Sequence, residues 1–218
     1  MLFPVPPKAQ RLLDFIGGFE APRGYNTLYN NSQFKPGAPV LTQMTLDQVI
    51  GRGTGWTQSY GSSACGRYQF MKATLESLKT EHGLKGNETM TPAFQDMLGY
   101  ALLRRRQYLM FEAGQIGVET FGLRLAQEWA SFPVLVDCPG AHRAVKRGQS
   151  YYTGDGKNKA LVPADAVEAM LHSLRVGAPP VIAPVGTNTE PGGVTYVKLP
   201  ASGWSAFVEF LRNVFKGK

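Results

Sequence analysis

A glutamate at the end of a predicted helix is the first residue of this sequence that could do chemistry. Leu12, Ile16 and Phe19 recur at helical spacing. Because Pro22 biases the backbone before it away from helical angles, we expect the helix to end at about Glu20. The negative end of the helix dipole disfavours an ionised carboxylate, so we expect a raised pKa for Glu20 and a role as general acid. Taken alone, the segment favours the alternative of a surface glutamate without a role.

The segment SYGSSACGRYQFMKATLESL, residues 59–78, has the composition of a loop that approaches a ligand. Small residues lead through Gly66 into a predicted helix, and glycine lets the backbone come close to a bound molecule. Tyr68 and Gln69 add an aromatic face and an amide beside it, and these groups suit a sugar. We expect both side chains to contact substrate, with packing at the helix start as the alternative.

The elements that must position these residues are mostly helices. Further helices are predicted over residues 69–82, over MTPAFQDMLGYALLRRR with Thr91 as N-cap, over VETFGLRLAQEWA, and from Pro163 to about residue 176. Residues 21–66 are instead rich in Gly, Asn, Ser, Thr and Pro, with a β-prone piece, APVLTQM, and a short helical candidate, TLDQVI. We interpret them as a small β-containing lobe, which makes the predicted fold class α+β, dominated by helices.

The character of the chain changes after residue 176. Residues 177–200 are rich in proline and glycine and are predicted to be a linker. Residues 201–218 have the pattern of a cationic amphipathic helix, which suits insertion at an anionic outer-membrane lipid surface. Docking of the same apolar face on the rest of the chain is the alternative. The predicted domains are therefore 1–176, catalytic; 177–200, linker; and 201–218, C-terminal helix.

Composition narrows the possible partners. The 218 residues are 43% hydrophobic and 11% aromatic, which excludes disorder throughout, and the net charge of +7 favours a polyanionic partner. No nucleic-acid motif accompanies the basic run at residues 104–106, so no nucleic acid is expected. The histidines and the two cysteines lack metal-ligand spacing, and we expect no metal and no cofactor. The N-terminal residues do not resemble a secretory signal, which predicts synthesis in the cytoplasm.

Several motifs, taken in order, resemble those of phage lambda-type endolysins and related phage muramidases, of the lysozyme-like superfamily. The chain has GGFEAPRGYN, an irregular lobe and ACGRYQF in the family's order, followed by FQDMLGYALLRRR, EWASFP and GQSYYTGDGKNKAL. It departs from the family at Cys65, where a small residue is usual, and in LTQMTLDQVIGRGTGWTQSYG, which looks more like muramidase domains of virion proteins. The resemblance implies a lysozyme-like fold and a monomer. It also implies action on peptidoglycan in the periplasm, with carriage in the virion as the alternative.

The resemblance also implies cleavage of the β-1,4 bond between N-acetylmuramic acid and N-acetylglucosamine, with Glu20 as the acid. The lobe offers only Asp47 as a second carboxylate, and a helix start explains that residue without chemistry. This favours a lytic transglycosylase, which needs no second carboxylate and leaves 1,6-anhydro ends. A hydrolytic muramidase is the alternative, and a non-catalytic envelope-binding or virion protein is another.

Three more residues within the resembling region are candidate substrate contacts. Of Tyr151 and Tyr152, one could form a platform for a sugar ring and the other fill the core. Ser131 could line the site, or it could simply end a helix. The sequence leaves these alternatives open.

Overall fold

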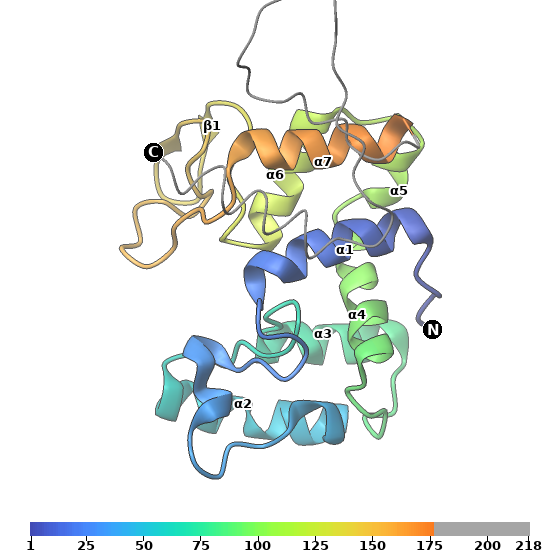
Figure 1. Cartoon of the computed structure of the whole chain (residues 1–218), viewed down its shortest axis with the longest axis vertical. Coiled ribbons are helices and arrows are strands. Elements are labelled where there is room, and N and C mark those ends of the chain that lie inside the picture. Colours follow the sequence, from blue (N-terminus) through green and yellow to red (C-terminus); the bar gives the residue numbers. More distant parts are fainter. Residues whose placement is uncertain (177–218) are drawn as a thin grey trace, which may run out of the picture. The chain divides into compact units, whose positions relative to one another are not determined.

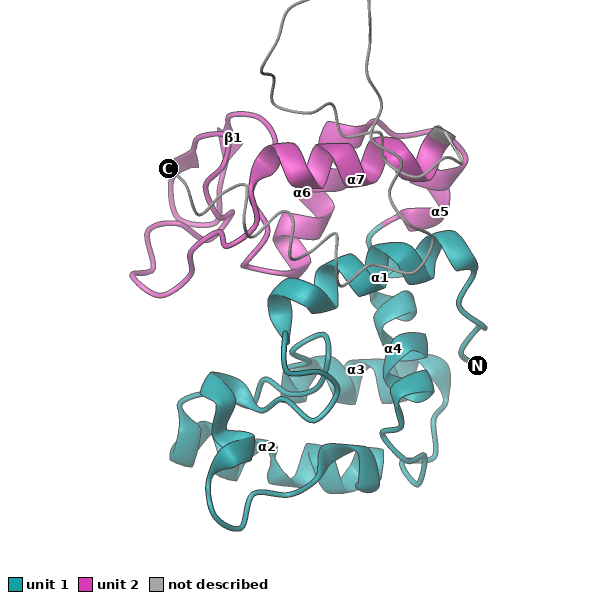
Figure 2. Ribbon diagram, in the orientation of Figure 1, with its two compact units in different colours: residues 1–106 teal, residues 107–218 magenta. Residues whose placement is uncertain are grey.

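The computed structural model describes residues 1–176, which belong to two compact units (Figure 1, Figure 2). Unit 1 comprises residues 1–106, and unit 2 begins at residue 107 and is described as far as residue 176. The predicted linker and C-terminal helix lie outside the described residues. The described chain is mostly helical, with one small sheet of two strands.

Unit 1 contains four α-helices and two short 3₁₀ helices: α1 (Pro7–Glu20), η1 (Tyr29–Phe34), η2 (Leu41–Gln43), α2 (Leu46–Tyr60), α3 (Lys72–His82) and α4 (Pro92–Arg105). Two predicted boundaries are confirmed. Helix α1 ends at Glu20, and α4 begins at Pro92 after Thr91, whose hydroxyl accepts a hydrogen bond from the backbone N–H of Phe94 at 3.2 Å. Helix α1 packs against α4, and α2 packs against α3.

The predicted β-containing lobe is wrong as a description of residues 21–66. Within this described segment the structure has no strand, only isolated bridges such as that between Leu28 and Cys65. Helix α2 occupies its second half, because Thr45 and Gln48 form a capping box that starts a helix over the short candidate TLDQVI. That helix continues for 15 residues to Gly61, which caps it in a left-handed conformation.

Unit 2 contains α5 (Tyr108–Glu112), α6 (Val118–Glu128), the strands β1 (Cys138–Pro139) and β2 (Ala144–Val145), and α7 (Ala164–Val176). The rings of Phe111 and Phe121 stack with centroids 4.4 Å apart, and α6 packs against α7. Arg147 ties the loop after β2 to α7, since its guanidinium donates to the carboxylates of Asp165 and Glu168. The small sheet of the described residues therefore lies in this unit, outside the segment predicted to be a β-containing lobe, and is compatible with the α+β class.

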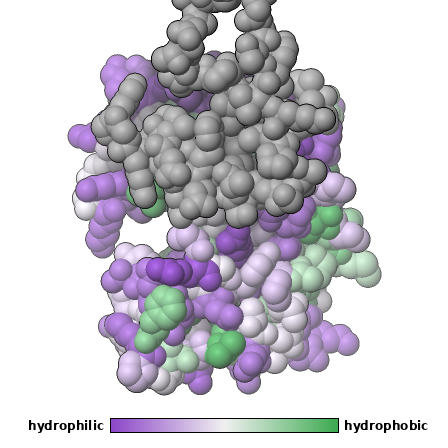
Figure 3. All heavy atoms as spheres, in the orientation of Figure 1, coloured by the Kyte–Doolittle hydropathy of each residue, from purple (hydrophilic) through white to green (hydrophobic). Residues whose placement is uncertain are grey.

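The surface of unit 1 is mainly hydrophilic on the face shown in Figure 3, where hydrophobic residues occur in small groups. Single exposed apolar residues of this kind are normal on folded proteins. Among residues 1–176, no helix is long and apolar enough to cross a bilayer.

Candidate active site

Glu20 is the last residue of α1 and is half-buried. The backbone N–H of Ala21 closes the final turn by donating to the carbonyl of Gly17 at 3.0 Å, and the φ of −143° at Ala21 then takes the chain out of the helix. Ala21 is completely buried. Glu20 therefore stands at a helix end that is followed directly by a buried residue.

A stripe of polar and small residues on α1 leads to this end. Gln10, Asp14, Gly17 and Ala21 follow one another at intervals of three or four residues, which places them on one helix face. The amide of Gln10 donates to Asp14 at 3.1 Å and to Asp96 of α4 at 3.3 Å. The stripe thus faces polar groups of α4 and not only apolar core.

Asp96 is the centre of these polar contacts. Its carboxylate accepts hydrogen bonds from the hydroxyl of Tyr68 at 2.6 Å and from that of Tyr25 at 3.0 Å. Burial, followed by the neighbouring Asp96, raises the pKa of Tyr25 to about 12, and burial with the same hydrogen-bonded carboxylate raises the pKa of Tyr68 well above its usual range. Both phenols therefore stay protonated and act as donors to Asp96.

The structure places the two predicted sugar contacts of unit 1 in different surroundings. The ring of Tyr68 is only 1% exposed and its hydroxyl is bonded to Asp96, as expected for the packing alternative. Gln69 is half-buried, has a positive φ of 50°, and donates its amide to the carbonyl of Gly66 at 2.9 Å. Substrate contact by these residues stays a prediction.

Three residues that the sequence interpretation missed hold this region together. The buried amide of Gln95 accepts from the backbone N–H of Arg67 at 2.9 Å and donates to the carbonyls of Tyr25 and Met90. Arg67 donates through Nη1 to the carbonyl of Ala21 at 3.1 Å. Asp96 is the third. Two polar residues in succession within an otherwise apolar stretch, the QD of FQDMLGY, are the signal that could have revealed Gln95 and Asp96.

Asp14 gives a test of these electrostatics through stability. Burial raises its pKa above the ordinary 3.8, with repulsion by Asp96 adding to the effect, while the bond from Gln10 and the charge of Arg67 oppose it. The folded state thus binds this proton more tightly than the unfolded state, and ionisation of Asp14 costs stability as pH rises above about 4.

We therefore expect Asp14→Asn to raise Tm slightly at pH 7, because asparagine can still accept from Gln10 without carrying the charge. The gain should disappear below about pH 4, where the carboxyl of the unfolded chain is also protonated. Thermal unfolding of both proteins across this pH range measures the difference. A lower Tm for the variant at pH 7 would contradict the electrostatic interpretation.

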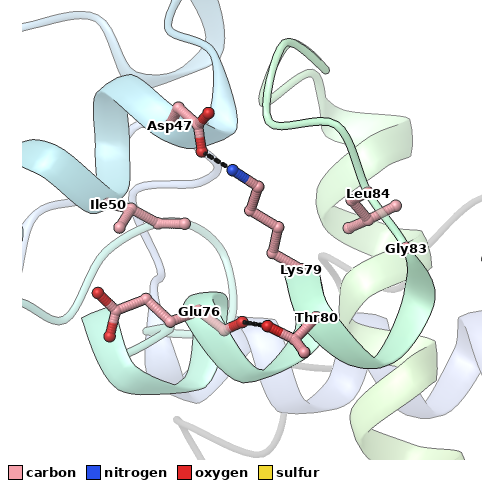
Figure 4. Close-up of a pocket in the computed structure, with 7 residues that line it drawn as sticks. All are labelled: Asp47, Ile50, Glu76, Lys79, Thr80, Gly83 and Leu84. Atoms are coloured by element: carbon pink, nitrogen blue, oxygen red, sulfur yellow. Dashed lines mark hydrogen bonds and ion pairs between the residues drawn. The ribbon is translucent and has the colours of Figure 1, made fainter.

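Asp47, the candidate for a second catalytic carboxylate, has a structural role. It lies in the first turn of α2, and its carboxylate pairs with the ammonium of Lys79 on α3 at 2.5 Å (Figure 4). The pair crosses a groove that is also lined by Ile50, Thr80 and Leu84. The groove's other acid, Glu76, lies 3.8 Å from Lys72. Both carboxylates are thus held in ion pairs, which agrees with the structural interpretation of Asp47.

The remaining predicted contacts belong to unit 2. Ser131 is 8% exposed, and its carbonyl accepts from the backbone N–H of Leu161 at 2.7 Å. The rings of Tyr151 and Tyr152 meet edge to face at 5.2 Å, and the hydroxyl of Tyr152 donates to the carbonyl of Gln127 at 2.7 Å. Both tyrosines are half-buried. The hydrogen bond to Gln127 favours Tyr152 as the tyrosine that packs in the core.

The two cysteines are free thiols. Burial raises the pKa of Cys65 to about 12, and the same cause raises that of Cys138. Cys65 lies in the bend before Arg67, where its thiol is 3.6 Å from the carbonyl of Phe70. A buried thiol of high pKa is a poor nucleophile, so Cys65 packs as a small apolar residue.

Comparison with known protein families gives a match. A family model described as Endolysin matches residues 22–156, more than half of the chain. The match includes the predicted contacts of both units and begins just after Glu20. No curated protein and no solved structure matches the chain.

Proposed function

The chain belongs to the Endolysin family, and from this premise we propose that it is a lysozyme-like lytic transglycosylase with Glu20 as its acid. Membership of the family makes the chain a phage-type cell-wall-degrading enzyme whose substrate is peptidoglycan. The proposal adds the bond, between N-acetylmuramic acid and N-acetylglucosamine, and the reaction.

The observation that carries the proposal is the position of Glu20, a half-buried carboxyl group at the end of α1. The other six acids of unit 1 are each engaged in a hydrogen bond or ion pair that belongs to the fold, so none of them is set apart as a second catalytic carboxylate. These six are Asp14, Asp47, Glu76, Glu81, Glu88 and Asp96. A mechanism in which one carboxyl group acts twice therefore suits unit 1 better than a paired-carboxylate mechanism.

In the proposed reaction the protonated carboxyl of Glu20 donates its proton to the glycosidic oxygen as the bond from C1 of the muramic sugar breaks. The resulting carboxylate then takes the proton of the C6 hydroxyl of the same sugar. The freed oxygen attacks C1, which closes the 1,6-anhydro ring and returns Glu20 to its protonated state. In the hydrolytic alternative, water takes the place of that hydroxyl and the product has a reducing end.

Within unit 1 we assign a glycan contact to Gln69, and within unit 2 to Ser131 and Tyr151, whereas Tyr68 and Tyr152 pack within their own units through their hydroxyl hydrogen bonds. The half-buried state of Tyr151 and its edge-to-face contact with Tyr152 support this division of roles. Action on peptidoglycan in the periplasm during lysis is proposed, with carriage in the virion as the alternative. No metal or cofactor takes part in the proposed steps.

The products of digestion test the proposed reaction directly. Purified peptidoglycan treated with the full chain should yield fragments that end in 1,6-anhydromuramic acid, because the C6 hydroxyl and not water captures C1. Mass spectrometry detects these ends as a loss of one water relative to reducing ends. Reducing muramic ends alone would establish the hydrolytic alternative and reopen the search for a second catalytic carboxylate.

A further inference from the structure

We propose that Arg67 is a positioning residue that holds the end of α1 and thereby sets the place of Glu20. The inference rests on the proposed function, since it assumes that Glu20 is the acid. Its basis is a set of contacts between the loop before α3 and the last turn of α1, which lie 46 positions apart in the sequence.

The first contact is a hydrogen bond to the peptide that follows the acid. Nη1 of Arg67 donates to the carbonyl of Ala21 at 3.1 Å, and Ala21 is completely buried. Helix ends leave carbonyls without intrahelical partners, and a cation near them is favourable because it opposes the negative end of the dipole. The last turn of α1 contains no basic residue of its own. Arg67 supplies that cation from another part of the chain.

The second contact is the close approach of the Arg67 side chain to Gly17 of α1. A Cβ built on Gly17 would meet Nε of Arg67, and it would lie 2.8 Å from Cγ and 2.9 Å from Cδ. Only glycine leaves room for the side chain to lie across this turn. Gly17 also provides the carbonyl that Ala21 bonds to, so the arginine spans both ends of the final hydrogen bond of α1.

The third group of contacts fixes Arg67 itself. Its backbone N–H donates to Gln95, and its guanidinium lies 5.7 Å from the ring centroid of Tyr25. Tyr25 is in turn bonded to Asp96. Helix α4 thus holds the loop, and the loop holds the end of α1.

One unfavourable feature of this arrangement indicates that it has a functional reason. Nε of Arg67 is buried without a hydrogen-bond partner among the described residues. A buried donor without a partner is unfavourable, and such groups in a folded protein call for an explanation. Fixing the helix end that carries the acid provides one, since small displacements of a catalytic group reduce rate strongly.

The test measures kcat and KM on short peptidoglycan fragments for Arg67→Met, Arg67→Lys and Gly17→Ala. Arg67→Met keeps a long side chain but loses the donors, and we expect kcat to fall about 10-fold or more with KM within about twofold. Arg67→Lys should recover part of kcat, because an ammonium can still donate to Ala21. Gly17→Ala should reproduce the fall in kcat with the arginine present, because the added methyl displaces it.

Arg23→Gln is the matched control. Arg23 lies two positions after Ala21 and also carries one positive charge, but its guanidinium is over the ring of Phe34 at 5.8 Å. Its loss should leave kcat within about twofold. An equal fall in this variant would mean that general charge, and not the contact with α1, sets the rate.

Glu20→Gln, measured alongside, separates failure of this inference from failure of the proposed function. If Glu20→Gln is inactive while folded Arg67→Met or Gly17→Ala keeps the normal kcat, Arg67 has no positioning role and the proposed function stands. A change in KM alone would also overturn the inference, since it would indicate direct substrate binding. If Glu20→Gln remains active, both fail.

Discussion

Replacing Glu20 by glutamine is expected to abolish peptidoglycan cleavage, with a loss of at least about 10²–10⁴-fold. Glutamine has nearly the same shape and can keep hydrogen bonds at the helix end, but it cannot donate the proton that the leaving oxygen needs. The reaction as proposed uses this carboxyl group in both steps, first as acid and then as base. The rate of release of glycan fragments from purified peptidoglycan measures the loss.

Glu76→Gln is a control for the removal of one carboxylate from unit 1. The side chain of Glu76 is 49% exposed and pairs with Lys72 at 3.8 Å on the surface of α3. Such exposed pairs contribute little, so both rate and Tm should stay close to those of the parent chain. Substantial cleavage by a well-folded Glu20→Gln protein would remove Glu20 from the mechanism.

The second large effect is expected for Gly66→Ala, which should lower the free energy of unfolding by about 2–5 kcal/mol. Gly66 has a φ of 76°, and a left-handed conformation costs alanine about 1–2 kcal/mol. A Cβ there would also lie 2.5 Å from the side-chain oxygen of Gln95. Because Gln95 is completely buried and makes three hydrogen bonds, it cannot move away without breaking them.

Gly61→Ala separates the two causes. Gly61 also has a positive φ, of 90°, but the nearest atom to its added Cβ is a ring carbon of Tyr29 at 3.8 Å, an ordinary contact. This control should therefore show only the conformational cost of about 1–2 kcal/mol. Urea unfolding of both variants gives the comparison, and equal losses would mean that Gln95 does not constrain the loop.

Local sequence alone determined where α1 ends and where α4 begins. Pro22 after Glu20 and the pair Thr91 and Pro92 mark their boundaries through backbone geometry and capping, which depend on neighbours along the chain. In residues 21–66 a signal of the same kind outweighed composition. The capping box of Thr45 and Gln48 started a helix there, and the composition that indicated a β-containing lobe did not prevent it from continuing.

The surroundings of the end of α1 were decided by tertiary structure. Tyr68 is of a residue type that suits a sugar contact. Its ring is nevertheless buried, and its hydroxyl donates a hydrogen bond to Asp96, 28 positions away. The role of Gly17 is visible only once Arg67 lies across it. Such contacts join residues whose separation in sequence carries no periodic signal. Spacing and composition therefore indicate Glu20 and its helix. Only the packing of α1, α4 and the loop before α3 decides which residues hold the end of that helix.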